Sequence, residues 1–145
     1  MTRARTTLRN DEHGTAVIEM AIALPVLVTM LYGIFSIGQL FQANAGIQHA
    51  LGEGARYGTL CTALSVDASG NSSCTLPTDA QIIARVNQRL FGAFNGTFDT
   101  PVVDSTTAAA GYKTITVTYH QTMQFAFFTG PTIDVVRSKR VYLAV

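Results

Sequence analysis

The sequence lacks tryptophan, and it has few of the residues that bind metals or nucleic acids. Its 145 residues include two cysteines and three histidines, and the histidines are scattered along the chain at His13, His49 and His120. A structural zinc site needs four ligands close together, which argues against one here. Charged residues make up 13% of the chain and the net charge is +1, whereas nucleic-acid-binding proteins usually carry a basic surface. We therefore expect no metal, no cofactor and no nucleic-acid partner.

A recognisable set of catalytic residues is also missing. No nucleophile, base and orienting acid follow one another in a familiar order. Asp67, Ser69 and Asn71 alternate like the start of a calcium loop, but the acidic residue that such a loop requires downstream is absent. We therefore expect that the protein is not an enzyme.

Apolar residues are abundant in this chain, and one long run of them contains almost no charge. They make up 48% of the chain, and the mean hydropathy is +0.25, which is high for a small soluble protein. From Thr15 to Phe41, a run of 27 residues, Glu19 is the only charged side chain and Gln39 the only amide. About 20 apolar residues suffice to cross a bilayer as a helix. The sequence thus predicts one membrane-spanning helix and contact with membrane lipid.

The distribution of arginines predicts the orientation of this helix. Three arginines precede it, whereas Arg56 is the only arginine or lysine within about 20 residues after it. The positive-inside rule then places the N-terminus in the cytoplasm and the rest of the chain outside. Ala43-Asn44-Ala45 also has the form of a signal peptidase site. The apolar run before it, however, is longer than the roughly 7 to 15 residues of a signal-peptide core.

Composition and periodicity divide the chain into three parts. Residues 1–14 are polar and read as a leader. Residues 15–57 form a transmembrane and stem helix, although Gly46, Gly52 and Gly54 weaken the stem. Residues 58–145 form an exported domain.

Within the exported domain, a helix is predicted to follow the capping box formed by Thr78 and Gln81 and to stop at Gly92. Beyond residue 100, apolar residues alternate with polar ones around Val117 and again towards the C-terminus, which is typical of strands. Turns are expected near Ala110-Gly111 and Thr129-Gly130-Pro131. The predicted fold is α+β, with a long N-terminal helix, a second short helix and a small antiparallel sheet.

The two cysteines, Cys61 and Cys74, both lie in the exported part and flank a polar loop. An oxidising compartment would allow them to pair, and a ring of this size stabilises a fold by about 3 kcal/mol in the chain-entropy model. The alternative is two reduced, buried thiols. We expect a disulfide.

Glu19 is the most informative residue of the apolar run. An acid at mid-bilayer costs about 2.5 to 3.5 kcal/mol on insertion scales. A carboxylate near the start of the span can also be hydrated at the membrane edge and interact favourably with the helix N-terminus. Position alone does not decide between a functional and a merely tolerated acid. The surrounding pattern adds a basic leader that ends in Gly14, Glu19 five residues later, and Pro25 within the helix.

This pattern resembles the N-terminus of type IV pilin-like precursors. Within that group, residues 14–58 are similar to the TadE-like family of minor pilins or pseudopilins of tight-adherence (Tad) pilus systems. The similarity is carried by Glu19, the Leu24-Pro25 step, Gly33, the segment from Gly38 to Phe41, and the run Glu-Gly-Ala-Arg-Tyr at residues 53–57. It implies a pilin-like fold and a role in pilus assembly or at the pilus tip.

The resemblance also implies specific partners and site residues. A prepilin peptidase would cut after Gly14, and the new ammonium on Thr15 would pair with Glu19 of its own chain or of a neighbouring subunit. Pro25 would let the helix bend as it packs. Partners would be other pilin or pseudopilin subunits and the assembly platform of the bacterial inner membrane, with the C-terminal domain in the periplasm or carried into the fibre. The alternative is an unprocessed single-span anchor whose exported domain binds another protein.

Overall fold

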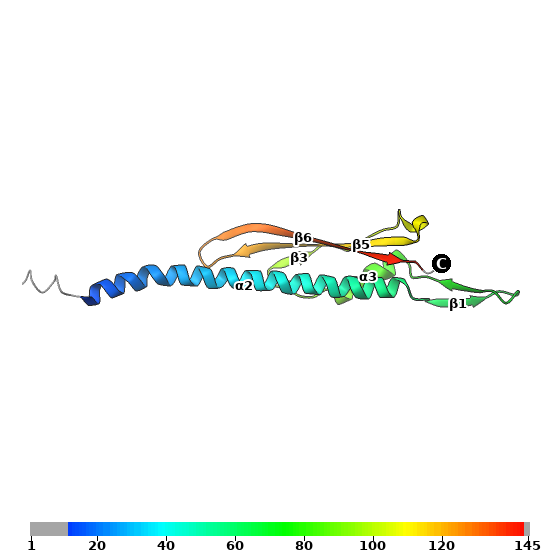
Figure 1. Cartoon of the computed structure of the whole chain (residues 1–145), viewed down its shortest axis with the longest axis horizontal. Helices are drawn as coiled ribbons and strands as arrows, with labels where there is room; N and C mark the ends of the chain where they lie inside the picture. The colour runs from blue at the N-terminus through cyan, green and yellow to red at the C-terminus, as the bar shows by residue number, and fades with distance from the viewer. Residues whose placement is uncertain (1–11, 144–145) are drawn as a thin grey trace, which may run out of the picture.

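The apolar run and the stem form one unbroken helix. The computed structural model describes residues 12–143, and in it helix α2 runs from Glu12 to Gly58, a length of 47 residues. At a rise of 1.5 Å per residue it is about 70 Å long, and it sets the long axis of the molecule (Figure 1). Pro25 lies inside it, and the blue N-terminal turns lie at a slight angle to the rest of the helix (Figure 1).

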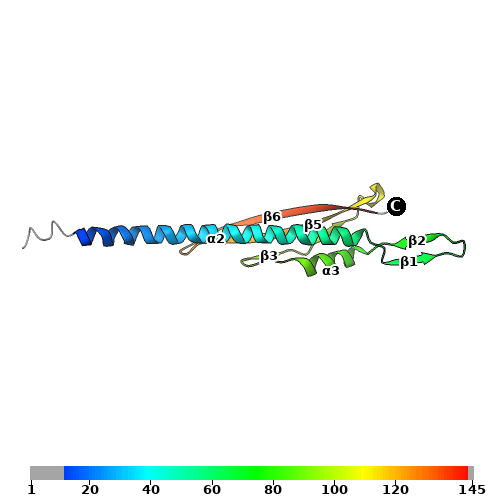
Figure 2. The ribbon, with the colours of Figure 1, turned by 60° about the horizontal axis from the view of Figure 1, so that its bottom comes forward.

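The other elements lie mostly along the C-terminal half of α2 or project beyond its end, and the turn between β5 and β6 extends further towards the N-terminal end (Figures 1 and 2). In chain order they are β1 (Ala63–Val66), β2 (Ser72–Thr75), α3 (Asp79–Arg89), β3 (Gly96–Phe98), β4 (Val102–Asp104), a 3-10 turn (Ala108–Ala110), β5 (Tyr112–Gln124) and β6 (Thr129–Tyr142). This arrangement confirms the α+β fold with a long N-terminal helix, a second short helix and small antiparallel sheets.

Strand β5 is the centre of the main sheet. Its partner on one side is β6, and the two strands pair antiparallel from Tyr112↔Tyr142 to Gln124↔Thr129. On its other side, β3 pairs with one part of β5 and β4 with another. The sheet is therefore a long hairpin with two short strands lying along one edge.

The core lies between this sheet and the stem half of α2. Ile115, Val117 and Tyr119 alternate along β5 and are fully buried, as the period of two requires. They belong to a cluster with residues of α2, α3 and β6: Ala43, Ile47, Ala50, Leu51, Ile82, Val86 and Val141. Burial of this apolar surface holds the helix and the sheet together.

Helix α3 begins as the sequence predicts and ends earlier. The Thr78 side chain accepts from the backbone N–H of Gln81, and the Gln81 side chain accepts from the N–H of Thr78. The helix ends at Arg89, because Leu90 is already extended. Gly92, the predicted stop, instead has a φ of +90° at the point where the chain passes close to the backbone of Ala43. Gly92 therefore directs the chain past α2 after the helix has ended.

One predicted turn is confirmed and the other is wrong. Gly111, with a φ of +82°, caps the short 3-10 turn before β5. The turn of the long hairpin, however, is closed by the N–H of Phe125 donating to the carbonyl of Phe128, and Thr129-Gly130-Pro131 belong to β6. A proline is tolerated in β6 because, among the described strands, this one pairs only with β5, which leaves its other edge unpaired by them. The ladder is also irregular between Thr122 and Gln124, opposite this segment.

Two stem glycines that the sequence marks as helix-weakening are needed for packing. A Cβ at Gly46 would overlap the carbonyl oxygen of Phe91, and a Cβ at Gly54 would overlap the side chain of Val86. Both contacts come from α3 or the residues just after it. Gly52 differs, because a Cβ there would meet only the Lys139 ammonium at 3.8 Å. Close approach of α3 to the stem thus depends on Gly46 and Gly54 but not on Gly52.

We expect Gly46→Ala to destabilise the protein and Gly52→Ala to stabilise it slightly. The first change forces a methyl group against a backbone carbonyl, and overpacking of this kind typically costs about 1 to 3 kcal/mol. The second lowers the backbone entropy of the unfolded chain, so it stabilises the folded helix by up to about 1 kcal/mol. The free energy of unfolding of the detergent-solubilised variants measures both effects. Equal stability of the two variants would contradict the packing role of Gly46.

Candidate functional site

Helix α2 consists of two halves with different surroundings. Every side chain from Gly14 to Leu27 is exposed, and the first buried side chain of the helix is Ser36. From Ala43 onwards, buried residues recur on the face that meets the domain. We call residues 14–35 the bare half and residues 36–58 the stem half.

Three polar contacts mark the boundary between the halves. The Ser36 hydroxyl donates to the carbonyl of Gln124 at 3.1 Å, and the buried Gln121 amide donates to the carbonyl of Ser36 at 3.1 Å. One turn later the Gln39 side-chain oxygen accepts from the Asn95 amide at 2.9 Å. Sequence reasoning counted Gln39 within the span and missed these contacts. The lone amide of the apolar run was the available signal, because a buried amide needs a partner.

The bare half exposes a surface that is almost entirely apolar. Most of its large apolar side chains, such as Ile22, are more than half exposed. Among the described residues, α2 is the one helix long and apolar enough to cross a membrane, with a mean hydropathy of 2.2 over its most apolar 18 residues. A groove of about 600 Å³ follows this helix from Glu19 to Met30. Lipid or the apolar faces of other helices are the surroundings that suit such a surface.

Gly14, Thr15 and Glu19 lie together in the first turns of α2. All three are exposed, and no described residue comes within 4 Å of where a Cβ on Gly14 would be. Thr15 and Glu19 are four residues apart and so lie on the same face of the helix. Helical side chains also point back towards the N-terminus, which directs the Glu19 carboxylate towards the backbone at Thr15. The predicted leader residues before Glu12 lie outside the described residues.

Pro25 interrupts the hydrogen bonding of the bare half without ending the helix. Proline has no N–H, so the carbonyl of Ala21, four residues earlier, has no helical donor from position 25. The Thr29 hydroxyl donates to the carbonyls of Pro25, at 3.0 Å, and Val26, at 2.8 Å. One backbone hydrogen bond of the helix is therefore missing between Ala21 and Pro25.

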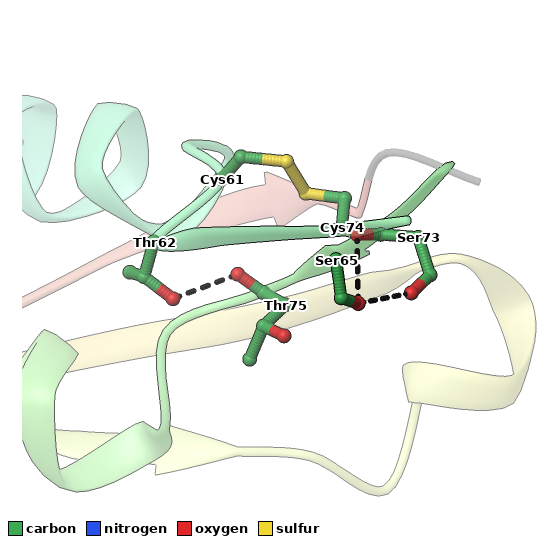
Figure 3. Close-up of a disulfide and its surroundings, with 6 residues drawn as sticks. All are labelled: Cys61, Thr62, Ser65, Ser73, Cys74 and Thr75. Carbon is green, nitrogen blue, oxygen red and sulfur yellow. Dashed lines mark hydrogen bonds between the residues drawn. A yellow bond between two sulfur atoms is a disulfide. The ribbon is translucent and has the colours of Figure 1, made fainter. Parts of the chain in front are cut away.

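A disulfide-bonded hairpin projects beyond the other end of α2. Strands β1 and β2 form this hairpin, which was expected to be a loop, and a disulfide joins Cys61 to Cys74 with their Cα atoms 5.4 Å apart. Figure 3 shows the side chains around it, where the Thr62 hydroxyl donates to the carbonyl of Thr75 at 2.7 Å. All residues from 59 to 75 are exposed. The disulfide thus stabilises a hairpin that has little core of its own.

The ion pairs that the structure describes lie on the domain. His120 on β5 lies between two carboxylates, with Nδ1 2.6 Å from Asp134 and Nε2 2.9 Å from Asp99. The hydrogen bonds with Asp134 and then Asp99 raise the pKa of His120 above its usual value. Elsewhere, the Lys113 ammonium donates to Asp79 at 2.6 Å and lowers the pKa of that carboxyl. The described residues contain no group of three or more His, Cys, Asp or Glu side chains that could hold a metal ion.

Comparison with known proteins identifies the N-terminal region. A family model described as TadE-like protein matches residues 14–56, which confirms the resemblance seen in the sequence over that range. The match covers the bare half of α2 and nearly all of the stem half, and it stops before the disulfide-bonded hairpin. No curated protein and no solved structure matches the chain.

The contacts of His120 predict that stability depends on pH. Because the folded pKa of His120 is raised above the unfolded value of 6.5, its contribution is fully present below about pH 6.5 and is lost as the pH rises through the folded pKa. We expect the stability difference between wild type and His120→Gln, measured by chemical unfolding, to shrink as the pH rises from about 6 to about 8. A difference that stays constant over this range would show that protonated His120 does not bridge the carboxylates.

Proposed function

We propose that the protein is a structural, non-enzymatic subunit of a Tad type IV pilus system, a minor pilin or pseudopilin that acts in pilus assembly or at the pilus tip. The observation that carries the proposal is the division of α2. A bare apolar half with one carboxylate continues directly into a half that carries a folded domain. The match of residues 14–56 to the TadE-like family supports the same assignment.

Before assembly, the bare half crosses the inner membrane. The N-terminus with Arg3, Arg5 and Arg9 stays in the cytoplasm, and the domain is held on the periplasmic side. The disulfide between Cys61 and Cys74 suits this oxidising compartment. The bare half alone has the length that a bilayer requires, so the bulk of the domain can stay outside the hydrocarbon core.

A prepilin peptidase then hydrolyses the peptide bond between Gly14 and Thr15. Gly14 offers no side chain to obstruct a peptidase and has open space around it. It also lies in the first turn of α2, where backbone N–H groups have no helical acceptor and the helix unwinds most easily. Hydrolysis leaves an ammonium on Thr15, one helical turn from the carboxylate of Glu19.

The new ammonium and Glu19 then act as a pair. Each charge is costly in a poorly solvated environment, and pairing offsets much of that cost. The ammonium pairs with Glu19 of its own chain or with Glu19 of a neighbouring subunit, which sets the axial register between two helices. The groove from Glu19 to Met30 receives apolar side chains of a neighbouring pilin helix, and the weak point at Pro25 lets the helix adjust. The inner-membrane assembly platform is the remaining partner.

We expect Glu19→Gln to impair assembly while insertion and leader removal continue. The glutamine has a similar size but cannot neutralise the ammonium of Thr15. Loss of one partner of a buried pair typically costs about 3 to 5 kcal/mol, and less at a hydrated edge. The readouts are membrane insertion, the intact mass of the protein, and co-purification with pilus or platform components. The mature chain should start at Thr15 and contain the 131 residues that remain of 145 after removal of 14.

Two further variants complete this comparison. Glu53→Gln makes the same change in the stem half of α2 and should co-purify like wild type. Gly14→Trp should retain residues 1–14, because the large side chain obstructs the peptidase. Equal recovery of Glu19→Gln and wild type in all three readouts would show that Glu19 is only a hydrated charge. Normal cutting of Gly14→Trp, or a native protein that keeps its first 14 residues, would point to the unprocessed single-span anchor.

A further inference from the structure

The turn of the long β5–β6 hairpin exposes aromatic side chains in a segment that contains no charged residue. We call residues 123–131 the hairpin tip. Phe127 is 69% exposed and Phe128 57% exposed, while the Phe125 and Phe128 rings stack with their centroids 4.6 Å apart. No charged residue occurs between His120 and Asp134. An exposed apolar group of this kind on a loop marks a contact surface.

Contacts with α2 fix the position of the hairpin tip along the helix axis, which we call its height. Gln124, the last residue of β5, accepts a hydrogen bond from Ser36, and a Cβ on Gly33 would lie 3.5 Å from the ring of Phe125. The hairpin points towards the N-terminal end of α2, and its turn lies beside the bare half (Figure 1). The tip therefore extends past the boundary at Ser36.

This height coincides with the outer surface of a membrane that the bare half would cross. The hydrocarbon core of a bilayer is about 30 Å thick and takes about 20 helical residues. A span of that length starting at Gly14 ends at Gly33. This is the residue of α2 that lies beside the Phe125 ring. Amphipathic helices that lie in the interface bury their apolar face about 5 to 10 Å deep, and the turn of the hairpin, which follows Phe125, lies beside the bare half (Figure 1).

We propose that the hairpin tip enters the outer interfacial layer of the bilayer, with Phe127 and Phe128 in contact with the upper acyl chains. This inference rests on the proposed function, since it needs the bare half to span the membrane. Lipid is the favoured occupant because it surrounds the bare half at this height in every unassembled subunit. The interfacial layer also offers water and headgroups to the unpaired edge of β6, which the hydrocarbon core would not.

A second apolar contact lies on another flank of α2. Phe94, in the loop before β3, is 60% exposed and borders a groove of about 400 Å³ that also includes Phe35 and Gly38. Figure 2 shows β3 and β6 on different sides of α2. The hairpin tip and Phe94 would thus contact the membrane surface on two sides of the helix, with the tip deeper. Together they would limit how far the domain can tilt on its stem.

The absence of tryptophan from the sequence allows a direct test. Phe127→Trp and Phe128→Trp each create a protein with one tryptophan at the hairpin tip. Tyr142→Trp is the matched control, because Tyr142 is 64% exposed at the end of β6 that lies far from the hairpin tip. Leu27→Trp reports separately on insertion of the bare half. Each full-length variant is reconstituted at high lipid-to-protein ratio in phosphatidylcholine vesicles, with or without bromine on the acyl chains.

We expect brominated lipid to quench both tip variants several-fold more than Tyr142→Trp, most strongly when the bromines lie near the headgroup end of the chain. Aqueous iodide should show the reverse order. Leu27→Trp should be quenched by the brominated lipid and protected from iodide.

The other outcomes separate the two proposals. If Leu27→Trp is quenched by brominated lipid but the tip variants behave like Tyr142→Trp, the hairpin inference is wrong and membrane insertion stands. If Leu27→Trp is not quenched either, insertion of the bare half and the hairpin inference both fail. If the tip variants are shielded from bromine and iodide alike, and dilution with lipid removes the shielding from iodide, a second copy of the chain covers the tip in place of lipid.

Discussion

One helix has to satisfy two kinds of surroundings, and the rest of the structure follows from that constraint. The stem half of α2 is a packing partner for the sheet and α3, so it needs small residues such as Gly46 and Gly54 where α3 approaches. In the proposed role, the bare half lies in lipid, so it needs side chains that are stable there. The polar contacts of Ser36 and Gln39 mark where one environment gives way to the other.

Because α2 is continuous, events at its two ends are mechanically connected. A pair between Thr15 and Glu19 would fix the inner end, and the core around Ile47 and Val117 fixes the outer end to the domain. Pro25, which lacks the N–H that would bond to the carbonyl of Ala21, lies between them. In the proposed role, the domain can therefore keep its fold while the bare half exchanges lipid for neighbouring helices. The stability of the domain and the assembly of the bare half therefore depend on different contacts of the same helix.

Patterns with a simple period could be predicted from the sequence, and contacts between distant segments could not. The apolar run predicts the long helix, the capping box at Thr78 predicts the start of α3, and the alternation around Val117 predicts the central strand. The hairpin turn was misplaced because Gly130 and Pro131 are typical turn residues, whereas the observed turn uses phenylalanines. The packing role of Gly46 depends on where Phe91 lies, and no local pattern contains that information. Of the candidate site, the sequence provided the order of Gly14, Thr15 and Glu19, while the structure added the boundary at Ser36.

The central claim is that the membrane divides α2 between its bare half and its stem half. Two variants, Ile22→Cys and Gln48→Cys, test this claim, and both positions are exposed in the structure. Intact spheroplasts that carry either variant are treated with a membrane-impermeant maleimide. The native cysteines are joined in a disulfide and should stay unlabelled without reductant. We expect Gln48→Cys to be labelled from outside and Ile22→Cys to be labelled only after the membrane is dissolved. Labelling of Ile22→Cys as readily as Gln48→Cys in intact spheroplasts would contradict the account.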